Sequence, residues 1–219
     1  MNLDLHVHSC FSQDSKTPVE AIVKQAYVVG LDGLAITDHN TTDAYFKARE
    51  IVEQTGLDLV IVPGVEVSTQ DGHMIALGVE NPPPAGTPFN ETANQVRHDG
   101  GVIVAPHPYK LWRNGIGSLK GRSLDAVEVL NSRSVVGFAN YLVARAAAHL
   151  GLGVTGGSDA HSLGMVGLAY TDVTVKSGAS AKDILNAIKS GRSEAKGYMS
   201  PRRHVLAHPF KAFVRHFHK

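Results

Sequence analysis

Short apolar runs alternate with amphipathic stretches along almost the whole chain, and most of the runs end in a polar cluster. The runs that we expect to form strands span residues 3–7, 33–37, 59–62, 66–68, 74–79, 102–105, 126–130, a stretch around 154, and 171–175. The expected helices span residues 17–27, 41–54, 91–99, 136–150 and 180–190. Strands and helices that alternate at this spacing predict a parallel sheet, and in a chain of 219 residues a closed or nearly closed barrel.

Composition narrows the class of protein. Apolar residues make up 43% and charged residues 19% of the chain, which is typical of a folded globular protein. The net charge of +1 gives no basic field for nucleic acid over the whole molecule, and a single cysteine excludes an internal disulfide framework. No run reaches membrane-spanning length, so we expect a cytoplasmic protein without a membrane partner. We divide the chain into a domain at 1–198 and a basic C-terminal helix or tail at 199–219, packed on the domain or extending from it.

Two histidines, His6 and His8, close the first run at positions i and i+2. Side chains alternate faces along a strand, so both project the same way, while Leu5 and Val7 pack on the other side. Two adjacent imidazoles suit a divalent metal, but two polar residues that merely end a strand would give the same pattern.

The other strand ends carry the same residue types. Taken singly, each has a plain structural explanation, such as a capping Asp, a histidine in a rigid Pro-His-Pro turn, or an exposed hairpin histidine. Together they would be a costly concentration of polar groups unless they are paired or bind metal. In α/β barrels such groups gather at the C-terminal ends of the strands. The residues at strand ends are Asp38, His39, Glu66, His107, Glu128, Asn131, Asp159 and His161; Asp14 lies in the loop after the first strand, and His73 starts the strand after the turn at Gly72.

Five motifs carry a family resemblance. They are Asp4-Leu5-His6-Val7-His8-Ser9, Thr37-Asp38-His39-Asn40, Gly64-Val65-Glu66, Pro106-His107-Pro108 and Ser158-Asp159-Ala160-His161. With these motifs in this order, the chain resembles the PHP (polymerase and histidinol phosphatase) family of metal-dependent phosphoesterases over residues 3–197. The resemblance implies an α/β fold, a distorted TIM-like (β/α)7 barrel, with the metal site at the C-terminal ends of the strands.

The resemblance also implies the ligands of two to three divalent metal ions. The first ion would be held by His6, His8, Glu66 and Asp159; the second by Glu66, which bridges the two, with His73 and His107; and the third by Asp14, His39 and His161. Asp4, Asp38 and Asn131 would orient these ligands. A ligand set of nitrogen and oxygen without thiolate fits Zn, Mn or Fe. We expect Cys10 to pack as a small apolar residue and not to bind metal.

Bridged metal ions can bind a hydroxide between them, and this hydroxide would attack phosphorus in line. The predicted catalytic set is Glu66, Asp159, His161 and Arg133. Arg133 is the best candidate to grip phosphate because it follows a strand end and its guanidinium suits phosphate geometry. Lys110 and Arg113, in the long loop expected at 108–123, are the next candidates, although any of the three could be an ordinary solvated charge.

The leading hypothesis is hydrolysis of a phosphate monoester of a small molecule, such as a nucleotide, a nucleoside bisphosphate or a compound like histidinol phosphate. A second hypothesis is a 5'-3' exonuclease on short oligonucleotides, with the basic tail holding a short nucleic acid. A third is a noncatalytic PHP-like module associated with nucleic acid, which would be expected to have lost ligands, whereas all nine candidate positions are occupied. A metal hydrolase that acts on amide or ester bonds is the residual alternative.

Overall fold

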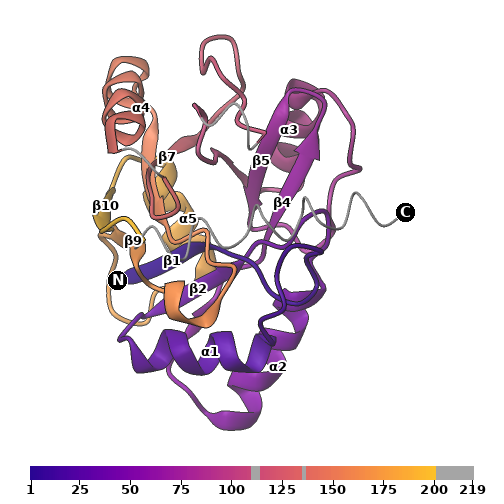
Figure 1. The fold of residues 1–219 in the computed structure, drawn as a ribbon, viewed down its shortest axis with the longest axis vertical. Helices are drawn as coiled ribbons and strands as arrows, with labels where there is room; N and C mark the ends of the chain where they lie inside the picture. The colour runs from indigo at the N-terminus through magenta and orange to yellow at the C-terminus, as the bar shows by residue number, and fades with distance from the viewer. Residues whose placement is uncertain (110–113, 135–136, 201–219) are drawn as a thin grey trace, which may run out of the picture.

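The computed structural model describes residues 1–109, 114–134 and 137–200 (Figure 1). The strands are β1 (Asn2–Val7), β2 (Gly33–Ile36), β3 (Val60–Ile61), β4 (Gly64–Thr69), β5 (Gly72–Leu77), β6 (Val102–Ala105), β7 (Ala126–Asn131), β8 (Gly153–Gly157), β9 (Ala169–Val173) and β10 (Ser193–Gly197). The α-helices are α1 (Val19–Val28), α2 (Asp43–Thr55), α3 (Phe89–His98), α4 (Gly137–Leu150) and α5 (Ala181–Lys189). The predicted alternation of strands and helices is therefore confirmed for most of the chain.

The strands form two five-stranded sheets, in the orders β10-β9-β1-β2-β3 and β4-β5-β6-β7-β8. Strands β1, β2 and β3 are parallel, as are β6, β7 and β8. The β4–β5 hairpin, the β5–β6 pair and the pairs of β9 with β1 and β10 are antiparallel. Both sheets are therefore mixed, and the prediction of a parallel sheet holds only in part. In the second sheet, for example, β4 and β5 are joined by the tight turn before Gly72 and not by a crossover helix.

The two sheets meet at the C-terminal ends of β1 and β2. An isolated parallel bridge joins His39 to Glu66, and a second joins Val7 to Ala160. Backbone bonds reinforce both junctions, from His8 N to Ala160 O at 2.9 Å and from Asn40 N to Glu66 O at 3.0 Å. Among the described residues the strand pairing does not run around into one closed barrel, so the TIM-like (β/α)7 barrel stays a prediction.

Three hydrophobic clusters make up the core. One lies between the β1–β2 side and helices α1 and α2, and another lies between β4–β7 and helices α3 and α4. The third takes residues from both sheets and from α5, including Leu3, Leu77, Val104 and Ile184. The two sheets therefore share an inner core that α5 helps to fill, and their polar strand ends lie beside one another at its margin.

Strand β1 departs from the simple alternation that the sequence predicted. Asp4 pairs with Leu34 and Val7 pairs with Ile36, so β1 advances by three residues where its partner β2 advances by two. This irregularity sends Leu5 into the core shared by both sheets, whereas Val7 packs in the cluster with α1 and α2. The expectation that Leu5 and Val7 share one packing face is wrong for this reason.

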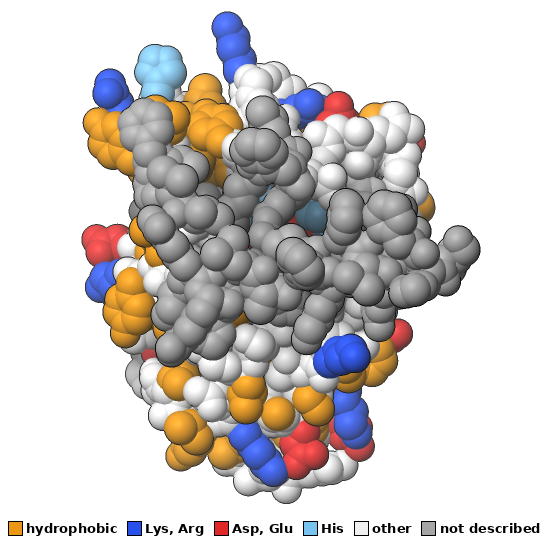
Figure 2. All heavy atoms as spheres, viewed as in Figure 1, with side chains coloured by type: hydrophobic (Ala, Val, Ile, Leu, Met, Phe, Trp, Pro, Cys, Tyr) orange, Lys and Arg blue, Asp and Glu red, His pale blue; other side chains and the backbone are white. Residues whose placement is uncertain are grey.

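Part of the described surface of α4 is apolar. Figure 2 shows hydrophobic side chains gathered at the upper left, in the region of α4 in Figure 1. Tyr141, Leu142 and Leu150 are exposed there. No helix in the described part of the chain is long and apolar enough to cross a membrane.

Candidate metal centre

The two histidines of β1 present their outer ring nitrogens to one point. His6 Nδ1 lies 2.9 Å from Glu128 Oε1, and His8 Nδ1 lies 3.1 Å from Ser12 Oγ. These contacts orient the rings so that their Nε2 atoms face each other at 3.2 Å. Burial, together with the neighbouring His161, lowers the pKa of His8 to about 4, so the imidazole of His8 is neutral and can donate a lone pair. The predicted common direction of His6 and His8 is confirmed.

Glu66 lies at the centre of the cluster and is 1% exposed. Its Oε1 lies 2.8 Å from His73 Nδ1 and 3.2 Å from His107 Nε2. Its Oε2 lies 3.2 Å from His8 Nε2, 3.4 Å from His39 Nδ1 and 3.6 Å from His6 Nε2. Burial favours the protonated acid, but the surrounding histidines outweigh it and hold the pKa of the Glu66 carboxyl well below its usual range.

A second carboxylate, Asp14, serves the outer end of the cluster. Asp14 Oδ2 lies 2.7 Å from His161 Nε2 and 3.6 Å from His39 Nε2. Burial lowers the pKa of His39, but Glu66 and Asp14 outweigh burial and raise it to about 9. Asp14 is 47% exposed, whereas the other predicted carboxylate ligands are buried, so this end of the site faces solvent.

The donor atoms fit divalent metal ions. Buried His39 Nδ1 makes no hydrogen bond within the described chain and points at Glu66 Oε2. A buried ring nitrogen without a hydrogen bond is costly, and a metal ion bound there in place of a proton would satisfy it. Four groups of three residues bring one ligand atom from each to within 4.8 Å of one another: His6, Glu66 and His107; His6, His8 and Asp159; His8, His39 and Glu66; and His8, Asp14 and His161.

All nine predicted ligand residues lie in this one cluster. His73 contacts Glu66, and its ring lies tilted beside that of His39, with ring centroids 4.9 Å apart. It is the most peripheral, because it belongs to none of those four groups. Cys10 is exposed and also belongs to none of them. Lys110, Arg113 and the tail after Ser200 lie outside the described residues.

Arg133 reaches the same cluster from the end of β7. Its side chain is buried, and Nη1 lies 3.1 Å from Asp159 Oδ1 and 2.9 Å from both ring nitrogens of His161. Arg133 Nε makes no hydrogen bond within the described residues. A guanidinium fixed by Asp159 keeps further donors for an anion at the metal cluster.

The three residues expected to orient the ligands divide into two kinds. Asn131 Nδ2 donates to Glu128 Oε2 at 2.8 Å and to Asp159 Oδ2 at 3.3 Å. Asp4 and Asp38 instead accept hydrogen bonds from the backbone, from Ser158 N at 3.0 Å and from Ser9 N at 2.7 Å. They hold the turns that carry the ligands and not the ligand side chains. Burial raises the pKa of Asp4 to about 6.

Sequence reasoning missed two residues of the site. The strand-end pattern includes Glu128 but predicts no role for it. Its side chain is buried and forms a hydrogen bond with His6. Its signal was a carboxylate between two valines, as in Glu66. Asn114, in the long loop at 108–123, accepts a bond from His73 N at 2.7 Å and places its Nδ2 3.2 Å from His73 Nε2. No local pattern distinguishes Asn114.

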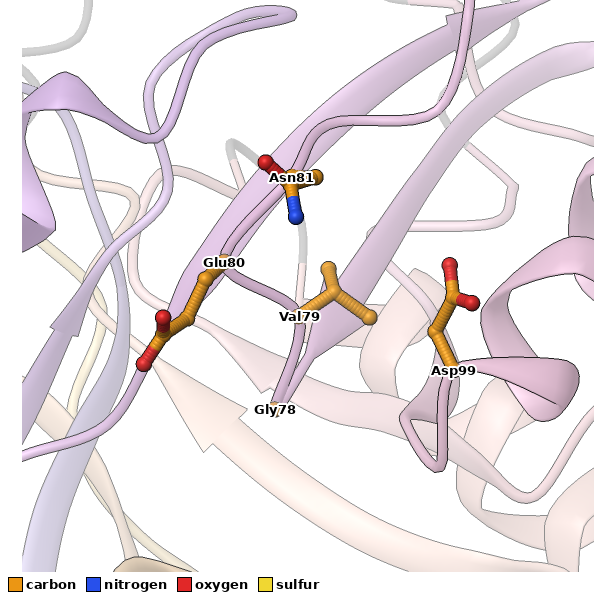
Figure 3. Close-up of a pocket in the computed structure, with 5 residues that line it drawn as sticks. All are labelled: Gly78, Val79, Glu80, Asn81 and Asp99. Carbon is orange, nitrogen blue, oxygen red and sulfur yellow. The ribbon is translucent and has the colours of Figure 1, made fainter.

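A separate cavity of about 350 Å³ contains none of these groups. Figure 3 shows its lining residues, Gly78, Val79, Glu80, Asn81 and Asp99. None of the predicted ligands lines it. The chemistry that the histidine cluster supports is therefore independent of this cavity.

Comparison with known proteins identifies the family. Residues 4–152 match the PHP domain, and residues 137–193 match the PHP-associated region. The chain belongs to the PHP domain family. Members of this family are metal-dependent phosphatases and phosphoesterases, so the chain is a hydrolase of that class.

Sequence relatives differ in their assigned activities. An uncharacterized protein of Methanocaldococcus jannaschii is 30% identical over 224 residues, 96% of this chain and 87% of that protein. The 5'-3' exoribonuclease Rnm of Salmonella typhimurium is 37% identical over 106 residues, 47% of this chain and 36% of the exoribonuclease. The 3',5'-nucleoside bisphosphate phosphatase of Chromobacterium violaceum is 34% identical over 88 residues, 38% of this chain and 30% of the phosphatase. The match therefore spans about a third of the exoribonuclease and about a third of the phosphatase.

A solved structure supports the fold over nearly the whole chain. A two-domain protein from Bacteroides vulgatus, described as containing a predicted PHP-like metal-dependent phosphoesterase, superposes with a TM-score of 0.75 at 20% identity. The superposition covers 96% of this chain and 69% of that one. At this identity the likeness concerns the fold alone.

Proposed function

We propose that this PHP-family protein is a phosphatase that removes phosphate from a small-molecule monoester, such as a nucleotide or a nucleoside bisphosphate. The observation that carries the proposal is the position of Glu66, whose two oxygens face five imidazoles within 3.6 Å. A carboxylate with ligand nitrogens on both of its oxygens is suited to bridge two metal ions.

The ligand sets follow from these contacts. The first ion would be held by Glu66 and Asp159 with His6 and His8, which the His6, His8 and Asp159 group supports. The second would be held by Glu66 and His107, which the His6, Glu66 and His107 group supports, with His73 at 2.8 Å from Glu66 Oε1. The third would be held by Asp14, His39 and His161, which the 2.7 Å contact of Asp14 with His161 supports. Bound Zn, Mn or Fe would supply Lewis acidity and lower the pKa of a water molecule toward neutrality.

The chain's own residues complete the chemistry. Arg133 donates hydrogen bonds to the phosphoryl oxygens from its position beside Asp159 and fixes the phosphate against the cluster. His161, whose Nε2 lies 2.7 Å from Asp14 Oδ2, is placed to give a proton to the leaving oxygen when no third ion occupies its ring. Asp159 keeps Arg133 in place through the 3.1 Å ion pair.

A 5'-3' exonuclease activity on short oligonucleotides is the second candidate. The similarity to the exoribonuclease Rnm over 106 residues favours it. Both activities use the same cluster, and they differ in what lies beyond the scissile phosphate.

Metal analysis followed by phosphate release tests the proposal. The purified protein should carry at least two divalent ions per chain and release phosphate from mononucleotides or nucleoside bisphosphates. Assays on 5'-phosphorylated oligonucleotides of a single length, with chromatography of the products, distinguish the two candidate functions. Release of mononucleotides from the oligonucleotide without phosphate release from the monoesters would favour the exonuclease. Fewer than two bound ions, with no turnover of either substrate, would overturn both.

A further inference from the structure

One buried carboxylate outside the predicted ligand sets contacts several of their members. Glu128 lies on β7 and is 2% exposed. We propose that Glu128 is a positioning residue that ties the ligands of the first metal ion to those of the second. This inference rests on the proposed function, because it concerns how the metal ligands are held.

Each oxygen of Glu128 serves a different strand end. Oε1 accepts from His6 Nδ1 at 2.9 Å, which fixes the ring so that Nε2 faces the cluster. Oε2 accepts from the backbone N of His107 at 3.0 Å and from Asn131 Nδ2 at 2.8 Å. Asn131 in turn donates to Asp159. Glu128 therefore reaches His6 and His107 directly, and Asp159 through one amide.

Two of the ligands that Glu128 serves have unfavourable backbone conformations. The φ of His107 is 31° and that of Asp159 is 51°, in the left-handed region that residues with a Cβ rarely adopt. Such conformations persist where the surroundings fix them. The bond from His107 N to Glu128 holds the backbone of His107, and the bond from Asn131 holds the side chain of Asp159.

Only a carboxylate satisfies this arrangement. Three donors converge on two oxygens, and both oxygens must accept. A glutamine has the same shape but one acceptor oxygen, so it can serve either His6 or the pair of His107 and Asn131. Its amide nitrogen would face a donor on the other side, and that donor would lose its partner.

Gly157 on β8 makes room for the contact between Glu128 and His6. A Cβ at this position would lie 2.5 Å from His6 Cβ and 2.6 Å from Glu128 Oε1. A methyl group here would therefore push these two side chains apart without changing the chemistry of the Glu128 carboxylate. Gly157→Ala is an independent way to disturb the same hydrogen bond.

Zn²⁺ affinity and nitrogen NMR of the imidazoles test the role of Glu128 in the full chain. In the Zn²⁺-loaded protein, His6 should carry its proton on Nδ1 and bind metal through Nε2. Glu128→Gln should weaken Zn²⁺ binding by about 10- to 100-fold, the usual effect of losing a partner that orients a ligand. Gly157→Ala should weaken it in the same direction.

Gly153→Ala is the matched control for crowding on β8. A Cβ there would lie 2.3 Å from Ile188 O, remote from the metal ligands, so both glycine variants should lose thermal stability. Only Gly157→Ala should lose Zn²⁺ affinity. The NMR measurement on the unaltered protein remains decisive if Glu128→Gln does not fold.

The failure of this inference is distinct from the failure of the proposed function. If the unaltered chain binds no Zn²⁺, the proposed function is wrong and the inference is lost with it. If the unaltered chain binds Zn²⁺ and hydrolyses phosphate esters while folded Glu128→Gln binds Zn²⁺ equally tightly, the inference alone is overturned. A His6 ring protonated on Nε2 in the Zn²⁺-loaded protein would overturn it as well.

Discussion

Replacing Glu66 by glutamine tests the centre of the cluster most directly. The substitution keeps the shape of the side chain but removes a charge that is 1% exposed and faces five imidazoles within 3.6 Å. The amide nitrogen would also point at ring nitrogens that now face an acceptor. We expect Glu66→Gln to change the metal-free protein as well as the loaded enzyme.

The size of the effect in the metal-free protein follows from His39. Although burial lowers the pKa of His39, Glu66 and Asp14 raise it to about 9 in the folded chain, against a usual value of 6.5. Because the folded pKa is the higher one, protonation stabilises the fold fully below pH 6.5, and this stabilisation is lost as the pH rises through 9. The difference corresponds to about 3 kcal/mol in the free energy of unfolding. In Glu66→Gln, we expect the stability lost between pH 6.5 and pH 9 to be smaller than in the unaltered protein by about 1 kcal/mol or more.

Urea unfolding of chelator-treated protein, at a pH near 6 and again above 9, measures this difference. Glu53→Gln is the matched control, because Glu53 is 67% exposed on α2 and pairs with Arg49 on the surface. It should leave the pH dependence of stability unchanged. In the metal-loaded enzyme, Glu66→Gln should lower turnover at least ~100-fold, because loss of a bridging ligand should cost more than the ~10- to 100-fold cost of losing a residue that orients a ligand. Unchanged pH dependence together with retained turnover would refute the bridging role of Glu66.

Three further substitutions have expected outcomes. Arg133→Ala removes a charge-assisted donor at the cluster, so steady-state kinetics should show a KM for a phosphate monoester that is about 10- to 100-fold higher. An unchanged KM would exclude Arg133 as the residue that binds the phosphate. Ile184→Ala opens a cavity in the core shared by both sheets, and urea unfolding should show a loss of about 2–5 kcal/mol; a loss near zero would mean that α5 does not pack there. Ser180→Ala breaks the capping box of α5, in which Ser180 Oγ accepts from Asp183 N at 3.3 Å, and should cost about 1 kcal/mol in the same assay, whereas a conservative Ser180→Thr change should cost less.

The sequence by itself determined the identity and order of the groups that meet in the cluster. Strand ends can be recognised from runs of apolar residues, and His6, His39, Glu66, His107 and Asp159 each follow or close such a run. A metal site demands particular side-chain types, so its residues leave a signal in the sequence even when hundreds of ångströms of extended chain separate them. The hairpin of β4 and β5 and the helix α5 were also predictable, because a tight turn and a capping serine are local features.

The tertiary structure alone decided how the strands divide and which partners hold the ligands. Strand β10 (Ser193–Gly197) has little intrinsic preference for extended structure and forms by pairing with β9. The contact of Glu128 with His6 spans 122 residues, and that of Asp14 with His161 spans 147. Arg133 was predictable as a cation near the site, but its pairing with Asp159 was not. Hydrogen bonds between distant strand ends depend on strand register and on space such as that left by Gly157, and neither leaves a periodic pattern in the sequence.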